Sequence, residues 1–335
     1  MKNFYFKEKI FILVKIRKIM EIKSVNYLFN RINFTKLKNN EKKLQIFKKK
    51  SLSKEKIFTK NENIKSKFIR NLVYLCATIT IFLLSFMIIY ILAKGIPYLK
   101  PSLFSLSYTS ENCSVIPAFV NTIFMTLISL LIACPLGIGS AIYLVEYANR
   151  GNKFVKLVRL TTETLTGIPS IIFGLFGMLF FVGTLKWGYS LLAGSFTVAI
   201  MILPTIMRTT EEALIAVPDS FREGSFGLGA GKLRTVFKVV LPSAVPGILS
   251  GVILASGRVI GETAALIYTA GTVAQIPHSI FGSGRTLAVH MYVLSSEGLH
   301  TNQAFATAVV LLFAVVSINA LANFVARKIG KNATI

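Results

Sequence analysis

Six long apolar runs, separated by short polar segments, dominate the sequence after residue 70. They lie at residues 72–93, 119–145, 164–185, 191–207, 244–268 and 304–326. Each is long enough, or nearly so, to cross the hydrocarbon core of a membrane as an α-helix, which takes about 20 residues. The pattern predicts an all-α integral membrane protein with six transmembrane helices, the first of which serves as the insertion signal.

Composition and charge divide the chain near residue 70. Hydrophobic residues make up 53% of the 335 residues and charged residues only 16%, whereas about a quarter of a soluble domain is charged. The net charge of +24 is uneven, because residues 1–70 hold 21 Lys and Arg against 5 Glu. We therefore expect a basic, disordered cytoplasmic tail over residues 1–70, and the first transmembrane helix with its external loop over residues 71–116.

The basic residues between the apolar runs predict the orientation of the chain. Lys and Arg number 21 in the tail, four in residues 146–163, five in residues 208–241 and three after the last run. The segments after the first, third and fifth apolar runs hold only two, one and one Lys or Arg residues. Because basic segments are retained in the cytoplasm, the alternation predicts a multi-pass protein of the cell membrane with both termini inside.

The basic tail has three interpretations. Its charge is expected to draw it onto anionic membrane lipid, at roughly 1 kcal/mol for each basic residue near the surface. Nucleic-acid binding is the less favoured alternative, and a start codon near residue 70 is the third. We expect membrane lipid as a partner and no nucleic acid.

The polar segment between the fourth and fifth apolar runs contains helix-ending and helix-capping residues in the order expected of a helical hairpin. Pro218 is expected to end one helix, and Ser220 and Glu223 have the capping-box spacing for the start of the next. Three glycines then permit a tight turn, and residues 232–240 form a second short helix that Pro242 ends. A simple connection needs far fewer residues, so this hairpin is expected to present a helix to a partner. The alternative is a solvated surface hairpin.

Residues of this hairpin resemble the EAA loop of ABC importer permeases. The match consists of Glu223-Gly-Ser, then Gly229 after three intervening residues, and Val239-x-Leu241-Pro242 after nine more intervening residues. Gly224 and Ser225 stand where that family usually has alanines. The resemblance implies that the cytoplasmic loop at 211–242 docks into an ATPase, with the coupling role carried by Glu223 and Gly229; we assign Glu211 and Glu212 to the same role.

Three further segments resemble phosphate permeases of the PstA and PstC type. They are residues 166–177, 203–212 and 257–265. The chain lacks a large insertion after the first apolar run, which is more like PstA. The resemblance spans roughly residues 70–330. It implies the type I ABC importer permease fold for a core at 117–330, and as partners a second, PstC-like permease subunit, a dimer of ATPase subunits and an external phosphate-binding protein.

Two ionisable residues interrupt the fifth apolar run. Arg258 and Glu262 are four residues apart, which predicts one face of one helix, and charges inside a membrane cost several kcal/mol unless paired or facing water. One interpretation is a structural ion pair. In the other, Arg258 binds an oxyanion such as phosphate, and Glu262 holds Arg258 when no anion is present. Arg208 is assigned to the same substrate pathway, and its alternative role is a cytoplasmic anchor.

Arg285 follows two glycines in a predicted external turn. This turn is a candidate for contacting an anion or the external carrier protein, and the alternative is an ordinary glycine turn.

No catalytic motif is complete in the sequence. Residues 227–232 imitate a phosphate-binding loop, but Phe226 stands where the first glycine is required and Leu233 replaces the hydroxyl residue. The three cysteines form neither a CxxC pattern nor a Cys/His cluster. We therefore expect no cofactor bound by this chain and a non-catalytic permease subunit, with ATP hydrolysed by a partner. Importers of other oxyanions, such as sulfate or molybdate, and an ion-driven transporter or channel are the alternatives.

Overall fold

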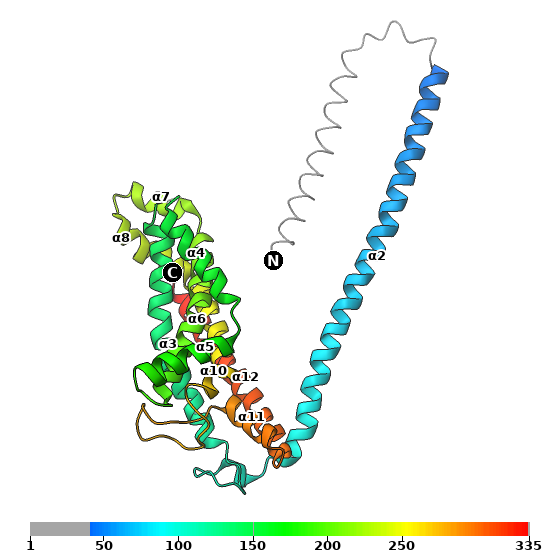
Figure 1. Ribbon diagram of the computed structural model, residues 1–335. Helices are drawn as coiled ribbons and strands as arrows, with labels where there is room; N and C mark the ends of the chain where they lie inside the picture. The colour runs from blue at the N-terminus through cyan, green and yellow to red at the C-terminus, as the bar shows by residue number, and fades with distance from the viewer. Residues whose placement is uncertain (1–40, 150, 334–335) are drawn as a thin grey trace. The chain divides into compact units, whose positions relative to one another are not determined.

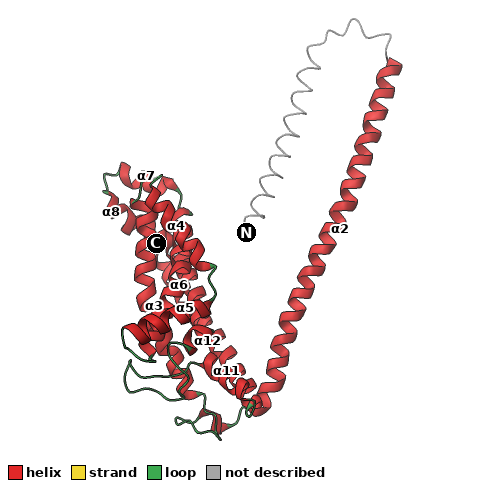
Figure 2. Cartoon of the chain, viewed as in Figure 1, coloured by secondary structure: helices red, strands yellow, loops and turns green. Residues whose placement is uncertain are grey.

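A computed structural model of the chain describes residues 41–149 and 151–333, and the regular secondary structure in these ranges is helical (Figures 1 and 2). The chain divides into two compact units, residues 1–83 and 84–335. In chain order the elements are α2 (Glu41–Gly95), η2 (Ile96–Tyr98), η3 (Pro101–Phe104), α3 (Ile116–Ile142), η4 (Tyr143–Tyr147), α4 (Lys153–Thr166), α5 (Ser170–Gly177), η5 (Met178–Thr184), α6 (Leu191–Ile215), α7 (Asp219–Gly227), α8 (Lys232–Thr235), η6 (Val236–Val240), α9 (Leu241–Ile260), α10 (Ala264–Ile267), α11 (Leu287–Glu297) and α12 (Thr301–Ala333).

The basic segment before residue 70 is partly helical. Helix α2 begins at Glu41 and runs through the predicted boundary without a break. The sequence predicted a disordered tail here, whereas residues 41–70 form the first part of α2; residues 1–40 lie outside the described residues. No Gly or Pro interrupts residues 41–70, so the helix of the following apolar run has no local reason to begin only at residue 70.

The described residues contain five helices that are long and apolar enough to span a membrane. They are Ser66–Tyr98, Ile116–Tyr147, Leu191–Ile215, Lys232–Ile260 and Thr301–Phe324. A sixth span is formed if Lys153–Thr166 and Ser170–Thr184, which are bent by 102° at their junction, cross together. The all-helical membrane fold is thus confirmed.

The third apolar run is a broken helix, whereas the sequence predicted a continuous one over residues 164–185. Helix α4 ends at Thr166, and α5 begins after Pro169, whose ψ of 142° is extended. The helical conformation is disfavoured for the residue that precedes a proline, and Gly167 adds backbone freedom at the same place. The chain therefore turns sharply between two short helices.

The fifth run also differs from its prediction at both ends. Pro242 does not end a helix, because the chain runs from α8 through the π-helical segment η6 directly into α9, where Pro242 occupies the first turn. The first turn tolerates a residue without an N–H. At the other end α9 stops at Ile260 rather than continuing to residue 268, and α10 follows after three residues.

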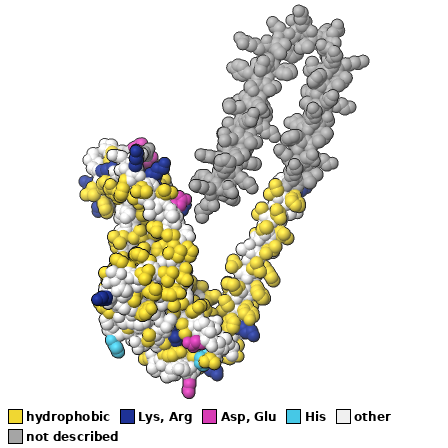
Figure 3. Space-filling model, viewed as in Figure 1, with side chains coloured by type: hydrophobic (Ala, Val, Ile, Leu, Met, Phe, Trp, Pro, Cys, Tyr) yellow, Lys and Arg dark blue, Asp and Glu magenta, His cyan; other side chains and the backbone are white. Residues whose placement is uncertain are grey.

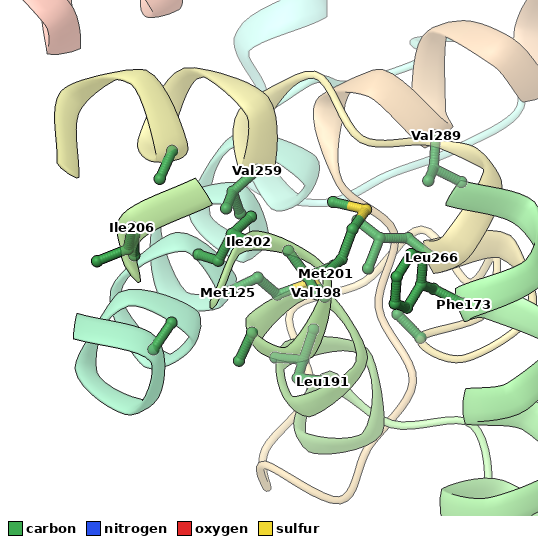
Figure 4. Packing of buried hydrophobic residues seen from close by; sticks show 14 residues of the cluster. Met125, Phe173, Leu191, Val198, Met201, Ile202, Ile206, Val259, Leu266 and Val289 are labelled. Carbon is green, nitrogen blue, oxygen red and sulfur yellow. The ribbon is translucent and has the colours of Figure 1, made fainter. Parts of the chain in front are cut away.

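Helix α6 lies at the centre of the second unit. In the most apolar stretch of α6, 67% of the residues are buried. The corresponding share is 28–33% for the spans Ile116–Tyr147, Lys232–Ile260 and Thr301–Phe324. Around it, Met125 of α3, Val198 and Ile202 of α6, Val259 of α9 and Leu266 of α10 form one buried cluster (Figure 4). Lipid is as apolar as these side chains, so close van der Waals packing stabilises the contact.

Gly174 allows α5 and α10 to touch backbone to backbone. A Cβ at this position would lie 2.7 Å from the Cα of Ala265. Neither backbone has room to move without displacing its helix. Small residues at such crossings are typical of membrane helix packing.

Gly174→Ala is expected to destabilise the protein by about 1–3 kcal/mol, the usual cost of overpacking. Gly139→Ala is the matched control, since a Cβ on Gly139 of α3 meets nothing within 4 Å, and alanine favours a helix more than glycine does. Thermal unfolding of both variants in the same detergent measures the difference. A Gly174→Ala melting temperature equal to that of Gly139→Ala would contradict the contact.

Candidate functional site

Helices α7 and α8 form a hairpin at one end of the second unit (Figure 1). The turn between them contains Gly229 at φ +81°, in the left-handed region that favours glycine. The hydroxyl of Ser225 and that of Thr235 are 2.9 Å apart and join the two helices. The predicted hairpin of two short helices around a glycine turn therefore exists.

The predicted capping box does not form. Helix α7 begins at Asp219, with Pro218 as its N-cap, and no side chain caps it. Ser220 consequently lies inside the first turn. The carboxylate of Asp219 provides the negative charge that a helix N-terminus favours.

Arg222 fastens the hairpin to the end of another span. Its Nη2 lies 2.7 Å from Oε1 of Glu146, in the π-helical segment η4 that extends α3, and its Nε also donates to this carboxylate. Both side chains are mostly buried, at 14% and 7% exposed. Arg222 also donates to the carbonyls of Leu214 and Val217 at 3.0 and 2.9 Å, near the end of α6. One guanidinium thus connects α3, α6 and α7.

The hydrogen bond with Glu146 raises the pKa of Arg222 above its ordinary value. A folded-state pKa raised in this way stabilises the protein at every pH below the ordinary pKa of an arginine side chain. The ion pair therefore persists throughout the neutral and alkaline range in which a transporter is measured.

A second contact supports the same connection. Nζ of Lys232, the first residue of α8, lies 5.2 Å from the ring centroid of Tyr147, the last residue of η4. Such cation–π contacts contribute about 0.5–1 kcal/mol at exposed sites. Around both contacts lies a cavity of about 590 Å³, lined in part by Glu146, Arg159 and Phe226.

The hairpin exposes apolar side chains among its charges. Leu228 at the turn is 90% exposed, and Leu233 of α8 is 65% exposed. Figure 3 shows charged side chains gathered at this end of the second unit, beside the apolar surface of the bundle. An exposed apolar tip with a charged rim is typical of a protein interaction surface.

The predicted coupling residues do not form one cluster. Glu223 and Gly229 are exposed on the hairpin. Glu211 instead forms an ion pair of 2.6 Å with Arg159 of α4, and Glu212 pairs with Arg208 one turn earlier in α6 at 3.3 Å. The structure therefore leaves Glu223 and Gly229 open to a partner and places Glu211 in a contact within the chain.

Arg258 and Glu262 do not share a helix. Arg258 is exposed in the last turn of α9, where it is the one charged residue of that helix. Glu262 follows the end of α9, is 8% exposed, and accepts a hydrogen bond of 3.1 Å from the N–H of Ala265 in α10. The predicted common helical face is wrong because the helix ends at Ile260.

The break between α9 and α10 explains how both charges are tolerated. The C-terminal end of a helix favours a cation, and the N-terminal end favours an anion. Arg258 lies at the C-terminal end of α9, and Glu262 lies at the N-terminal end of α10. The described residues contain no ion pair between them, so the guanidinium of Arg258 is available for another anion.

Arg208 lies in α6, and among the described residues its one ion pair is with Glu212. The side chains are 53% and 67% exposed, and the Arg208 Nε donates to Glu212 at 3.3 Å. This exposed pair fits the anchor interpretation as well as the pathway interpretation, and the pathway role stays a prediction.

Sequence reasoning missed the pair Arg222 and Glu146. The two residues are 76 positions apart, so no local spacing connects them. The one sequence feature that pointed to such a pair was the position of Glu146, a lone carboxylate at the end of an apolar run. A charge placed there needs a partner or water.

The fold and the hairpin define a membrane-spanning importer subunit of the ABC class. Residues 133–332 match the family described as the binding-protein-dependent transport system inner membrane component. The chain belongs to this family of multi-pass inner-membrane permeases, as its sequence predicted. Permeases of this kind work with ATPase and binding-protein partners and are generally not catalytic themselves.

Individual relatives agree with this assignment. The chain is 34% identical over 297 residues to the probable ABC transporter permease YqgI of Bacillus subtilis, covering 82% of this chain and 99% of that protein. It is 35% identical over 232 residues to the phosphate transport system permease PstA of Pasteurella multocida, covering 65% and 82%. A bacterial ABC transporter that imports the acidic polysaccharide alginate has a similar fold, with a TM-score of 0.59 at 18% identity over 80% of this chain and 98% of the matched chain.

Proposed function

We propose that the chain is a permease subunit of an ATP-driven importer of inorganic phosphate. It lines the translocation pathway beside a second, PstC-like permease, receives phosphate from an external binding protein, and is driven by two ATPase subunits. Its two termini lie in the cytoplasm, as does the hairpin of α7 and α8. Phosphate passes through unmodified.

The observation that carries this proposal is the exposed Arg258 at the end of α9. A permanent charge in a helix of otherwise uncharged residues must face water, an anion or a partner. A guanidinium binds two phosphate oxygens at once through its planar donors. The PstA protein of Pasteurella multocida, among the similar proteins, is a phosphate transport permease by name, which supports phosphate as the anion.

The broken helix suits such a site. Irregular backbone at membrane depth is tolerated where it lines a cavity, and transporters use the ends of discontinuous helices to bind ions. Gly261 and Thr263 separate α9 from α10 at this place. In the proposed cycle, closure of the ATPases moves the hairpin, which shifts α3 and α6 and turns the Arg258 site from the outside to the inside.

Reconstitution of the chain with its partner subunits tests the proposal. We expect the phosphate-loaded binding protein to stimulate ATP hydrolysis at least tenfold over the unloaded protein in the same vesicles. Sulfate and molybdate in parallel assays separate phosphate from other oxyanions, which Arg258 alone does not distinguish. Stimulation by sulfate or molybdate but not by phosphate would replace the proposed substrate.

A further inference from the structure

Arg285 is a buried cation that the proposed pathway does not use. It lies in the irregular segment between α10 and α11, at the end of the bundle opposite to α7 and α8 (Figure 1). The residue is only 4% exposed. Its Nη1 makes a long contact of 3.5 Å with the carbonyl of Thr272, and the ring centroid of Tyr108 lies 4.6 Å from its Cζ.

The two remaining donor atoms of this guanidinium have no partner. Nε and Nη2 are buried and donate no hydrogen bond to any described residue. These two atoms form one edge of the planar group, which is the edge that binds two oxygens of one carboxylate or phosphate. Arg285 forms no ion pair with a described residue, and a guanidinium does not lose its proton in proteins.

Other polar atoms close to Arg285 are also unpaired. Oδ1 of Asn121 has no partner, although Nδ2 of the same side chain donates to the carbonyl of Arg285 at 3.2 Å. Nδ1 of His290 is unpaired as well. Burial, reinforced by the charge of Arg285, lowers the pKa of His290 to about 3. The imidazole is therefore neutral at pH 7 and adds no second charge to the cluster.

The main chain holds Arg285 in place. Its N–H donates to the carbonyl of Val273 at 3.0 Å, and its carbonyl accepts from Asn121. A buried charge without a counter-charge costs several kcal/mol, and this cost persists unless an anion occupies the free edge. Residues 272–283, two of whose carbonyls contact Arg285, are irregular and largely exposed, and segments of this kind are the ones that open locally at low cost.

We propose that Arg285 binds a free tetrahedral oxyanion through its Nε and Nη2 edge, as a second anion site at the end of the bundle opposite to the hairpin. The inference rests on the proposed function for the direction of transport, in which this end is external and receives the released anion. It does not depend on which oxyanion is carried. Arg285 thus precedes Arg258 along the pathway.

The test measures binding rather than transport. The full chain, purified with its partner subunits in lipid nanodiscs, carries Arg258→Gln so that the deeper site is disabled. Binding of radiolabelled inorganic phosphate, and separately of sulfate, is then measured by equilibrium dialysis. Arg285→Gln and Arg285→Lys are added in turn. Lys100→Gln is the control, because it removes one charge from an exposed side chain outside the cluster.

We expect the Arg258→Gln protein to retain an anion site that Arg285→Gln weakens at least tenfold and that Lys100→Gln leaves unchanged. Arg285→Lys keeps the charge and lacks the two-donor edge, so it also weakens binding and decides the result if Arg285→Gln does not fold. Binding unaffected by Arg285→Lys, or absent for both anions before Arg285 is changed, overturns the inference. Binding of sulfate but not phosphate supports this site and contradicts the proposed substrate.

Discussion

Arg222→Ala is expected to lower the free energy of unfolding by about 3–5 kcal/mol and to uncouple ATP hydrolysis from transport. The substitution leaves the carboxylate of Glu146, whose side chain is 7% exposed, without its counter-charge. It also removes the donors to the carbonyls of Leu214 and Val217. The hairpin then keeps only the weaker contact of Lys232 with η4, the segment that extends α3, so movement of the hairpin is transmitted poorly to that span.

Unfolding in detergent and the ratio of phosphate transported to ATP hydrolysed measure the two effects. Arg208→Ala is the control for stability, since it breaks an ion pair exposed by 53% and 67%, and such pairs contribute about 0–1 kcal/mol. The double variant Glu146→Ala/Arg222→Ala is expected to lose less stability than the two single changes added together. Strict additivity would show that the pair is not coupled.

Arg258→Gln is expected to lower the maximal rate of phosphate uptake about 100-fold. Two charge-assisted hydrogen bonds of about 1.5 kcal/mol each are lost, and every 1.4 kcal/mol corresponds to a factor of ten. Arg258→Lys keeps the charge without the planar donors and is expected to lose about tenfold. Arg258 is not packed inside the bundle, so its replacement should leave the melting temperature nearly unchanged.

Uptake into vesicles containing the complete transporter measures this effect. Lys100→Gln removes the same charge from an exposed position away from α9 and is expected to transport normally. Uptake by Arg258→Gln at the rate of the unsubstituted transporter would remove Arg258 from the pathway. It would leave the family assignment intact, because that assignment does not depend on this residue.

Local chemistry along the chain was enough to predict the membrane helices and the hairpin. Apolar runs of about 20 residues have few alternatives in a bilayer, since a single segment satisfies its own backbone hydrogen bonds there only as a helix. The glycine turn at Gly229 was also local, because the positive φ of +81° is a property of a single residue. The spacing from Glu223 to Pro242 was sufficient to predict the family, which the match over residues 133–332 confirms.

Helix breaks were predicted less well, because competing local preferences meet there. Proline is typical of the end of a helix, yet Pro242 lies in the first turn of α9, where proline is tolerated. Arg258 and Glu262 have helical spacing, yet Gly261 ends the helix between them. In both cases the same residue type is compatible with more than one local conformation, so its presence alone did not give the position of the break.

The sequence by itself determined the class of fold, the apolar spans and the presence of a charge at Arg258. Only the tertiary structure decided which charges meet. Arg222 reaches Glu146 across 76 residues. Because Lys and Arg far outnumber Asp and Glu, some basic residues must lack an acidic partner, and the structure shows that the buried Arg285 is one of them among the described residues. Periodicity and spacing report on neighbours within a turn or two of one helix, whereas an ion pair depends on how separate helices pack.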